Sequence, residues 1–145
     1  MYYYLQDDSK AIEIYDYLLN KEDSSITDDA RCNIYVKLAC IHMHKRDYKL
    51  AAETFSKSTK LNVKLDAGIL NTIGFVNEMS ENFITAFQYY TLSSEKNYDY
   101  AHLNLAYMYE KGIYIEKDQD KASMYYQKGK DSLEEWRASR DKFSK

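Results

Sequence analysis

The chain has 145 residues, a formal net charge of −3 and a hydrophobic content of 45%, so it can bury a core and is not of the disordered class. It contains no proline and only four glycines, which argues against β-rich folds and low-complexity chains because their turns depend on these residues. The overall negative charge gives no basic footprint for nucleic acid, and no apolar run is long enough to span a membrane.

Apolar residues follow three-four spacing along nearly the whole chain, which predicts an all-α protein of about seven to eight helices. The first helix is expected over residues 9–20. A polar, acidic segment over residues 21–29 follows it, and the end of this segment, Thr27-Asp28-Asp29, offers N-caps for the second helix. The further helices are expected over residues 30–45, 48–61, 67–79, 83–96, 98–111 and 118–128, with a last helix in the charged tail. Asn97 stands where a left-handed residue suits a helix end.

An internal repeat accompanies these helices. An alanine and an aromatic residue four positions later open the second helix of each predicted hairpin, and the successive alanines are 40, 35 and 36 residues apart. A large residue followed by a small one precedes three of these pairs. Small residues let two helices approach closely, so we expect Ala51, Ala86 and Ala122 to be buried at the hairpin crossings. The pairs are Ala11 and Tyr15, Ala51 and Phe55, Ala86 and Tyr90, and Ala122 and Tyr126; the couplets are Leu38-Ala39, Ile73-Gly74 and Leu105-Ala106.

Residues 101–112, followed by residues 118–128, resemble the Sel-like repeat, whose pattern joins A-x-x-x-L-G-x-x-Y-x-x-G to D-x-x-K-A-x-x-W-Y-x-K-A. Ala106 replaces the usual Gly, Tyr125 the usual Trp and Gly129 the usual Ala. Residues 35–55 are closer to the related tetratricopeptide repeat, and residues 70–93 lie between the two types. The resemblance implies an α-solenoid of antiparallel helix hairpins forming one domain over residues 1–145. Its repeat units are expected at about 1–22, 30–62, 67–97 and 98–130, with a capping helix over 131–143.

The two cysteines indicate a reducing compartment. Cys32 and Cys40 are eight positions apart in one predicted helix, which separates them by about 12 Å, too far for a disulfide. The N-terminus has neither the basic nor the long apolar region of a signal peptide. Together these features lead us to expect a cytoplasmic protein.

The sequence contains no pattern that indicates catalysis. His42 and His44 point to different faces of one helix and cannot chelate a metal together, and His102 is isolated. Zinc-site, phosphate-loop and nucleophile signatures are absent. We therefore expect no catalytic residue, no metal and no cofactor, and a protein that is not an enzyme.

The resemblance also implies a concave groove lined by the first helices of the hairpins, where a segment of another protein binds. The lining is apolar and aromatic with amides and two acids, and it lacks the Lys, Arg and Asn set with which chaperone-binding tetratricopeptide domains clamp a terminal carboxylate. We therefore expect an apolar or amphipathic partner segment. The expected groove residues are Tyr3 and Tyr4 at the N-terminal edge, then Asn33, Val36, Cys40, Met43, Asn71, Phe75, Glu78, Leu103, Tyr107 and Glu110.

Two functional hypotheses follow, together with a purely structural interpretation of the groove. The first is a non-enzymatic interaction module, such as an adapter, a small chaperone or an inhibitor, with no nucleic acid or membrane as partner. The second is a homo-oligomer that assembles through the incomplete ends of the solenoid, because the first unit lacks most of its first helix. On the structural interpretation, the array is too short to curve and the groove residues only pack against their neighbours. At the C-terminal end, we expect Trp136 to be partly buried against the last hairpin, beside Tyr126 or Tyr125.

Overall fold

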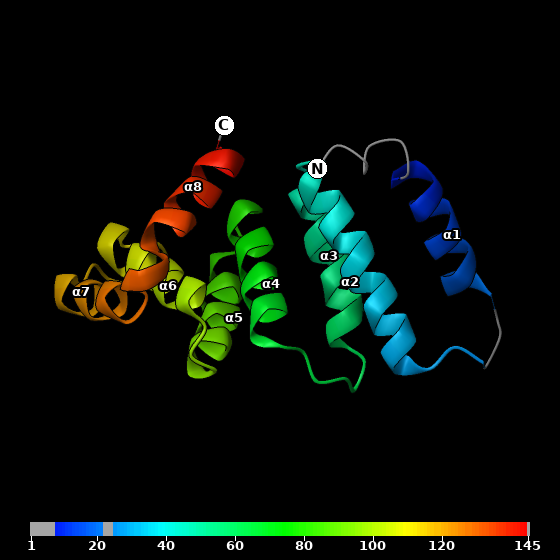
Figure 1. Ribbon diagram of the computed structural model, residues 1–145, viewed down its shortest axis with the longest axis horizontal. Coiled ribbons are helices and arrows are strands. Elements are labelled where there is room, and N and C mark those ends of the chain that lie inside the picture. The colour runs from blue at the N-terminus through cyan, green and yellow to red at the C-terminus, as the bar shows by residue number, and fades with distance from the viewer. Residues whose placement is uncertain (1–7, 22–24, 145) are drawn as a thin grey trace. The chain divides into compact units, whose positions relative to one another are not determined.

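The computed structural model describes residues 8–21 and 25–144, and the regular structure in these ranges is entirely helical. The all-α class is therefore confirmed. None of the described helices combines the length and apolar character needed to cross a membrane. The helices are α1 (Asp8–Asn20), α2 (Asp28–His44), α3 (Tyr48–Thr59), α4 (Ala67–Met79), α5 (Phe83–Glu95), α6 (Asp99–Lys111), α7 (Gln119–Lys128), the 3-10 helix η1 (Lys130–Ser132) and α8 (Leu133–Ser144) (Figure 1).

The chain divides into two compact units. The N-terminal unit ends at Lys64 and contains α1 to α3, whereas the C-terminal unit begins at Leu65 and contains α4 to α8. In the N-terminal unit α2 pairs with α3, and in the C-terminal unit α4 pairs with α5 and α6 with α7. We describe each unit by itself. That the repeat units form a single domain stays a prediction.

Side-chain caps start several of these helices as the sequence indicates. The Thr27 hydroxyl oxygen accepts a hydrogen bond from the backbone N–H of Ala30, 3.2 Å away, and so satisfies one free donor at the start of α2. Asp47, Asp66 and Asp118 cap α3, α4 and α7 in the same way. The expected cap at Thr27 is confirmed.

Residues in the left-handed conformation end four helices. Arg46 after α2 and Glu81 after α4 have φ of 62° and 63°, and each directly precedes the N-cap residue of the next helix. Asn97, with φ of 58°, confirms the prediction for the end of α5. Gly112 ends α6 with φ of 68°, a conformation that glycine adopts without steric cost.

Small residues hold the helices of each hairpin close together. Ala51 and Ala86 are 0% exposed and Ala122 is 2% exposed, which confirms their predicted burial at the crossings. At Gly74 of α4, a Cβ atom would lie 2.5 Å from Cδ1 of Tyr90, so the Tyr90 ring packs directly on the α4 backbone. Ala86 and Tyr90 belong to the apolar core of the C-terminal unit. The small residues of the other two couplets, Ala39 and Ala106, are 0% exposed.

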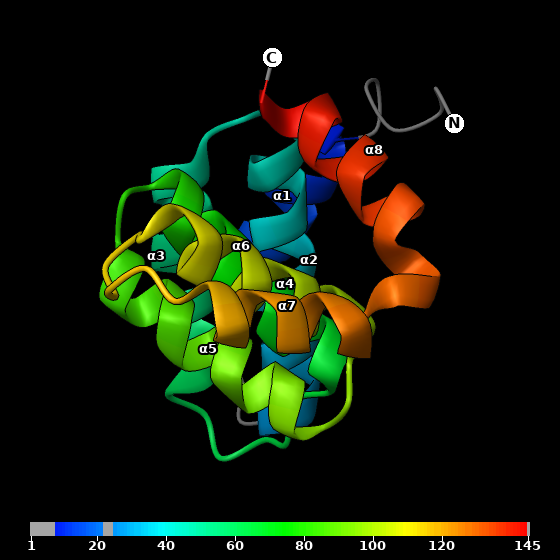
Figure 2. The same ribbon diagram turned by 90° about the vertical axis from the view of Figure 1, so that its left-hand side faces the viewer.

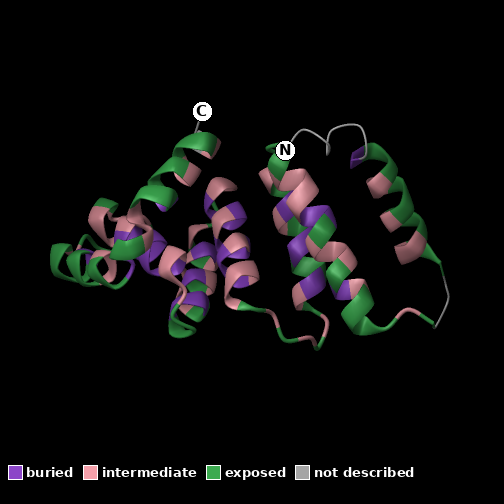
Figure 3. Ribbon diagram, viewed as in Figure 1, coloured by how far each residue is buried: buried purple, intermediate pink, exposed green. Residues whose placement is uncertain are grey.

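After α7 the chain turns through η1 and enters α8, as Figure 2 shows. Gly129 precedes this turn, in close contact with Leu103 of α6. Figure 3 shows α8 with much of its length exposed, whereas α4 and α6 are largely buried. The helix expected in the charged tail is therefore present.

Candidate partner-binding groove

The C-terminal helix α8 lies on the side of α4 and α6 that the sequence predicts as a groove. We call this side the inner face. Trp136 of α8 is 5% exposed, and its ring centroid lies 6.2 Å from that of Tyr107 and 6.4 Å from that of Tyr126. Both ring pairs are edge-to-face, the arrangement that aromatic quadrupoles favour. The predicted burial of Trp136 against the last hairpin, beside Tyr126, is confirmed. The inner face consists of Asn71, Phe75 and Glu78 of α4 with Asn104 and Tyr107 of α6.

An ion pair joins α8 to α4. The guanidinium of Arg140 donates from both terminal nitrogens to the Glu78 carboxylate, with Nη1 3.3 Å from Oε1. The two side chains are 15% and 7% exposed. Arg140 also lies over the Tyr107 ring, 4.4 Å from its centroid, and faces the Trp136 ring at 5.4 Å. Burial makes such charge-assisted and cation–π contacts stronger than they are in water.

The Asn104 side-chain amide connects three helices. Its oxygen accepts from Nε1 of Trp136 at 2.8 Å and from Nη1 of Arg140 at 2.9 Å. Its nitrogen donates to the side-chain oxygen of Asn71, 2.8 Å away on α4. Every buried side-chain polar atom of the described residues has a hydrogen-bond partner, so this network lies in the core without orphaned groups.

Burial and the nearby Glu78 carboxylate determine the protonation of Tyr90 and Arg140 in this network. The Tyr90 hydroxyl donates to the Glu78 carboxylate at 3.0 Å, and burial together with that nearby negative charge raises the pKa of Tyr90 well above its ordinary value. Burial opposes the charge of Arg140, but attraction to Glu78 outweighs it and raises the pKa of the guanidinium. Tyr90 and Arg140 therefore both remain hydrogen-bond donors at neutral pH.

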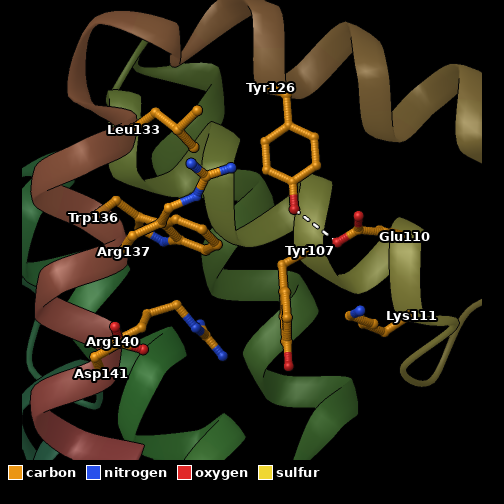
Figure 4. Close-up of a pocket in the computed structure, with 9 residues that line it drawn as sticks. All are labelled: Tyr107, Glu110, Lys111, Tyr126, Leu133, Trp136, Arg137, Arg140 and Asp141. Atoms are coloured by element: carbon orange, nitrogen blue, oxygen red, sulfur yellow. Dashed lines mark hydrogen bonds between the residues drawn. The ribbon is translucent and has the colours of Figure 1, made fainter.

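An open pocket of about 420 Å³ lies beside the network, with walls from α6, α7 and α8. Figure 4 shows the rings of Tyr107 and Tyr126 between the helices, with the Tyr126 hydroxyl donating to Glu110 at 2.9 Å. Burial and this acceptor raise the pKa of Tyr126. The pocket is thus aromatic and mixed in charge. Its lining consists of Tyr107, Glu110, Lys111, Tyr126, Leu133, Trp136, Arg137, Arg140 and Asp141.

The structure brings several predicted groove residues together under α8. Phe75 and Tyr107 both contact this helix: Phe75 faces Phe143, with ring centroids 5.3 Å apart, and Tyr107 faces Trp136. Asn71 and Glu78 are hydrogen-bonded in the network, and Glu110 lines the pocket.

The other predicted groove residues have different surroundings. Leu103 is fully buried and packs against Gly129, so its side chain lies within the core of the unit. In the N-terminal unit, Asn33 is exposed on α2, whereas Val36, Cys40 and Met43 are partly exposed. The predictions for Tyr3 and Tyr4 concern residues outside the described ranges.

Sequence reasoning did not include Asn104 and Arg140 in the groove, and it assigned Trp136 only a capping role. For Arg140 and Trp136, a signal is present in the sequence of the tail. Trp136, Arg140 and Phe143 are spaced four and three residues apart, which places all three on one face of a helix. Such a face indicates a helix that docks through these side chains, although spacing alone does not identify the surface that receives it.

These features define a helical-hairpin repeat protein: paired helices of similar length, small residues at the crossings and recurring turn geometry. Comparison with known families identifies the repeat. Residues 74–98 and 99–132 each match the Sel1 repeat, so this part of the chain carries two Sel1 repeats, in agreement with the expected resemblance. Sel1 repeats are generally protein–protein interaction modules. No curated protein matches the chain. The matched residues end immediately before α8, so Trp136 and Arg140 lie outside the repeat itself.

Proposed function

We propose that the chain is a non-enzymatic adapter, small chaperone or inhibitor that binds an apolar or amphipathic segment of another protein on the inner face of its C-terminal unit. The occupancy of this face by α8 is the observation that carries the proposal. α8 is itself an amphipathic helix, with Trp136 buried on one side and Arg137 exposed on the other. The inner face therefore has the shape and chemistry to receive a helix.

The lining supports an apolar partner segment more than an acidic one. Phe75 and Tyr107 present aromatic surface, and Glu78 and Glu110 place two carboxylates on the same side of the unit. An acidic tail would meet like charge at these carboxylates. The proposed partner is accordingly a protein segment, not a nucleic acid or a membrane.

Truncation of the two aromatic anchors tests this function. A pull-down from the native host followed by mass spectrometry would identify a partner. Phe75→Ala and Tyr107→Ala should then weaken its binding by about thirtyfold or more, because central aromatic anchors commonly contribute 2 kcal/mol or more. Circular dichroism must first show that each variant folds.

Exposed residues provide matched controls for these variants. Ile84→Ala removes a large apolar side chain that is 55% exposed on α5, and Lys57→Ala removes an exposed lysine on α3. Both should bind the partner like the parent chain. Folded Phe75→Ala and Tyr107→Ala variants that bind as tightly as the parent would end the proposal and redirect attention to the loops and the solenoid ends.

A second candidate function is self-assembly through the N-terminal end. Ile14 and Tyr17 are 56% and 65% exposed and lie three positions apart on α1, so two large apolar side chains are neighbours on its surface. Because α8 packs on its own unit, α1 is the helix to test for self-assembly. Light scattering over a range of concentrations decides: a growing mass that Tyr17→Ser suppresses supports assembly, and a constant monomer mass rejects it.

We also propose a cytoplasmic location. Cys32 and Cys40 are both free thiols, and burial raises the pKa of each. Thiols with a raised pKa are poorly ionised and react slowly, which suits reduced structural cysteines. Fractionation of the native host with an antibody to the chain would test this location.

A further inference from the structure

The contacts of α8 show which chemical groups the inner face accepts. Three side chains of one helix face reach it at spacings of four and three residues: Trp136, Arg140 and Phe143. Trp136 packs on Tyr107, and Phe143 packs on Phe75. Arg140 lies between these aromatic contacts along the helix. The inner face is therefore matched to an aromatic residue, a cation and a second aromatic residue in a fixed order.

The middle position is specific for arginine. The Glu78 side chain is 7% exposed, and a buried carboxylate is strongly destabilising unless a cation pairs with it. Arg140 meets this need with two nitrogens on the carboxylate and a third acceptor on Asn104, while its flat face covers Tyr107. A lysine would supply a point charge but neither the forked donors nor the planar stack.

This match is carried by a helix that the repeat does not include. The residues that match the Sel1 repeat end at residue 132, and α8 begins at Leu133. Next to the docked helix, the pocket between α6, α7 and α8 gives access to Trp136 and Arg140 from outside. Four of the five inner-face residues, all except Asn71, thus lie within the matched repeats, whereas α8 follows the repeats in the chain.

We propose that the inner face binds a helical segment of a partner protein that carries an arginine with an aromatic residue four positions before it and another three positions after it, and that α8 competes with this segment for the site. The inference deepens the proposed function and rests on it. It adds the chemistry of the partner, which the charge of buried Glu78 dictates. It also predicts that a partner segment binds the parent chain, in which α8 covers the inner face, more weakly than it would bind the same face without α8.

A peptide with the sequence of residues 130–145 is the probe for this site. The receptor is the full-length chain carrying Trp136→Ala and Arg140→Ala, which weakens its own α8 and leaves every inner-face residue in place. The fluorescein-labelled peptide should bind this receptor, as followed by anisotropy. The same peptide with Arg140→Ala should bind about thirtyfold more weakly or worse, because it leaves the Glu78 carboxylate unpaired.

Two controls isolate the role of the arginine. A peptide with Arg137→Ala loses a side chain that is 59% exposed and pairs with Glu134, so it should bind like the parent peptide. A receptor that also carries Glu78→Gln should prefer the parent peptide over the Arg140→Ala peptide much less strongly, because only the contacts of the arginine with Asn104 and Tyr107 remain. Persistence of the full arginine preference in that receptor would refute Glu78 as its origin.

The parent chain gives a second measurement in case the double variant does not fold. An unlabelled peptide carrying Trp136→Phe adds no indole, so the tryptophan emission comes from the chain alone. Excess peptide should displace α8 and shift this emission to the red, and the same peptide with Arg140→Ala should do so only at much higher concentration. An emission that no peptide concentration changes would overturn the competition.

The outcomes separate this inference from the function on which it rests. Equal binding of the parent and Arg140→Ala peptides overturns the arginine requirement but leaves a helix-binding groove. Peptide binding that survives Phe75→Ala and Tyr107→Ala in the receptor places the site elsewhere and contradicts the groove itself. Absence of peptide binding to a folded receptor overturns the inference. The proposed function is tested separately, by the binding of a captured partner to the Phe75→Ala and Tyr107→Ala variants.

Discussion

The hairpin of the N-terminal unit and the hairpins of the C-terminal unit share their packing but differ on the face that their first helices present. The small residues at the crossings, Ala51 and Ala86, are fully buried in both units. The turns agree as well, with Arg46 and Glu81 in the same left-handed conformation. One packing signature therefore produces the same hairpin in both units.

The inner positions diverge. On α2, Asn33 is exposed and Val36 is partly exposed, whereas on α4 the corresponding surface carries the buried polar residues Asn71 and Glu78. Both of these are hydrogen-bonded, and Glu78 pairs with Arg140 of α8. The recurring residues therefore define the hairpin, and the residues between them determine whether a further helix docks on its inner side.

The largest expected effect on stability comes from breaking the ion pair between Arg140 and Glu78, which lies in the C-terminal unit. Arg140→Ala should destabilise the chain by about 3–5 kcal/mol, because it leaves the buried Glu78 carboxylate without its cation. Urea unfolding followed by circular dichroism measures the change. Arg137→Ala, three residues earlier on the exposed side of α8, should change stability by about 0.5 kcal/mol or less. Similar losses of stability in Arg140→Ala and Arg137→Ala would contradict the importance of the Arg140–Glu78 pair for the C-terminal unit.

The shared signature is tested by one substitution made in both units. Ala51→Leu and Ala86→Leu should each lower stability by about 1–3 kcal/mol, because a larger side chain overpacks a crossing that is already closed. Thermal melts provide the measurement. Ala138→Leu places the same change at an exposed position of α8 and should be nearly neutral. Melts of the two crossing variants that coincide with the parent would show that the repeat phase is misassigned.

A smaller, pH-dependent effect is expected in the C-terminal unit. His102 is buried, its Nδ1 lies 2.8 Å from the Ser94 hydroxyl, and its ring stacks on Tyr125. Burial, aided by the charge of Lys128, lowers the pKa of His102, so the folded chain favours the neutral ring. Stability is then complete above the ordinary histidine pKa and falls as the pH drops below it, because the unfolded chain binds the proton first.

His102→Gln isolates this effect from the other histidines. The thermal midpoint of the parent should decrease when the pH is lowered from about 7.5 to about 5.5, and the decrease should be smaller in the variant. His42 in the N-terminal unit also has a pKa lowered by burial, so some pH dependence remains in the variant. Superimposable pH profiles of parent and variant would mean that His102 contributes nothing to it.

Much of the fold could be predicted because its determinants are local. Helix periodicity, the cap at Thr27 and the left-handed position at Asn97 are each set by a few neighbouring residues, and all are confirmed. The buried alanines could also be predicted, since the repeat supplies the same contact several times. In these cases the sequence pattern and the physical requirement coincide.

The docking of α8 could not be predicted in the same way. The faces of α4 and α6 are set by repeat phase, but the surface that a tail helix covers depends on long-range contacts such as Arg140 with Glu78, 62 residues apart. Asn104 was missed for the same reason, because its amide is explained only by Asn71 and Trp136 on other helices. Leu103, its neighbour, faces Gly129 instead.

The most direct test of the account is the fluorescence of Trp136, the single tryptophan of the chain. If α8 is seated on the inner face, the folded parent should emit to the blue of a water-exposed indole and resist quenching by acrylamide. Arg140→Ala should shift the emission to the red while circular dichroism still reports a helical chain. An emission like that of free indole in the folded parent would contradict the docking of α8 and with it the proposed site.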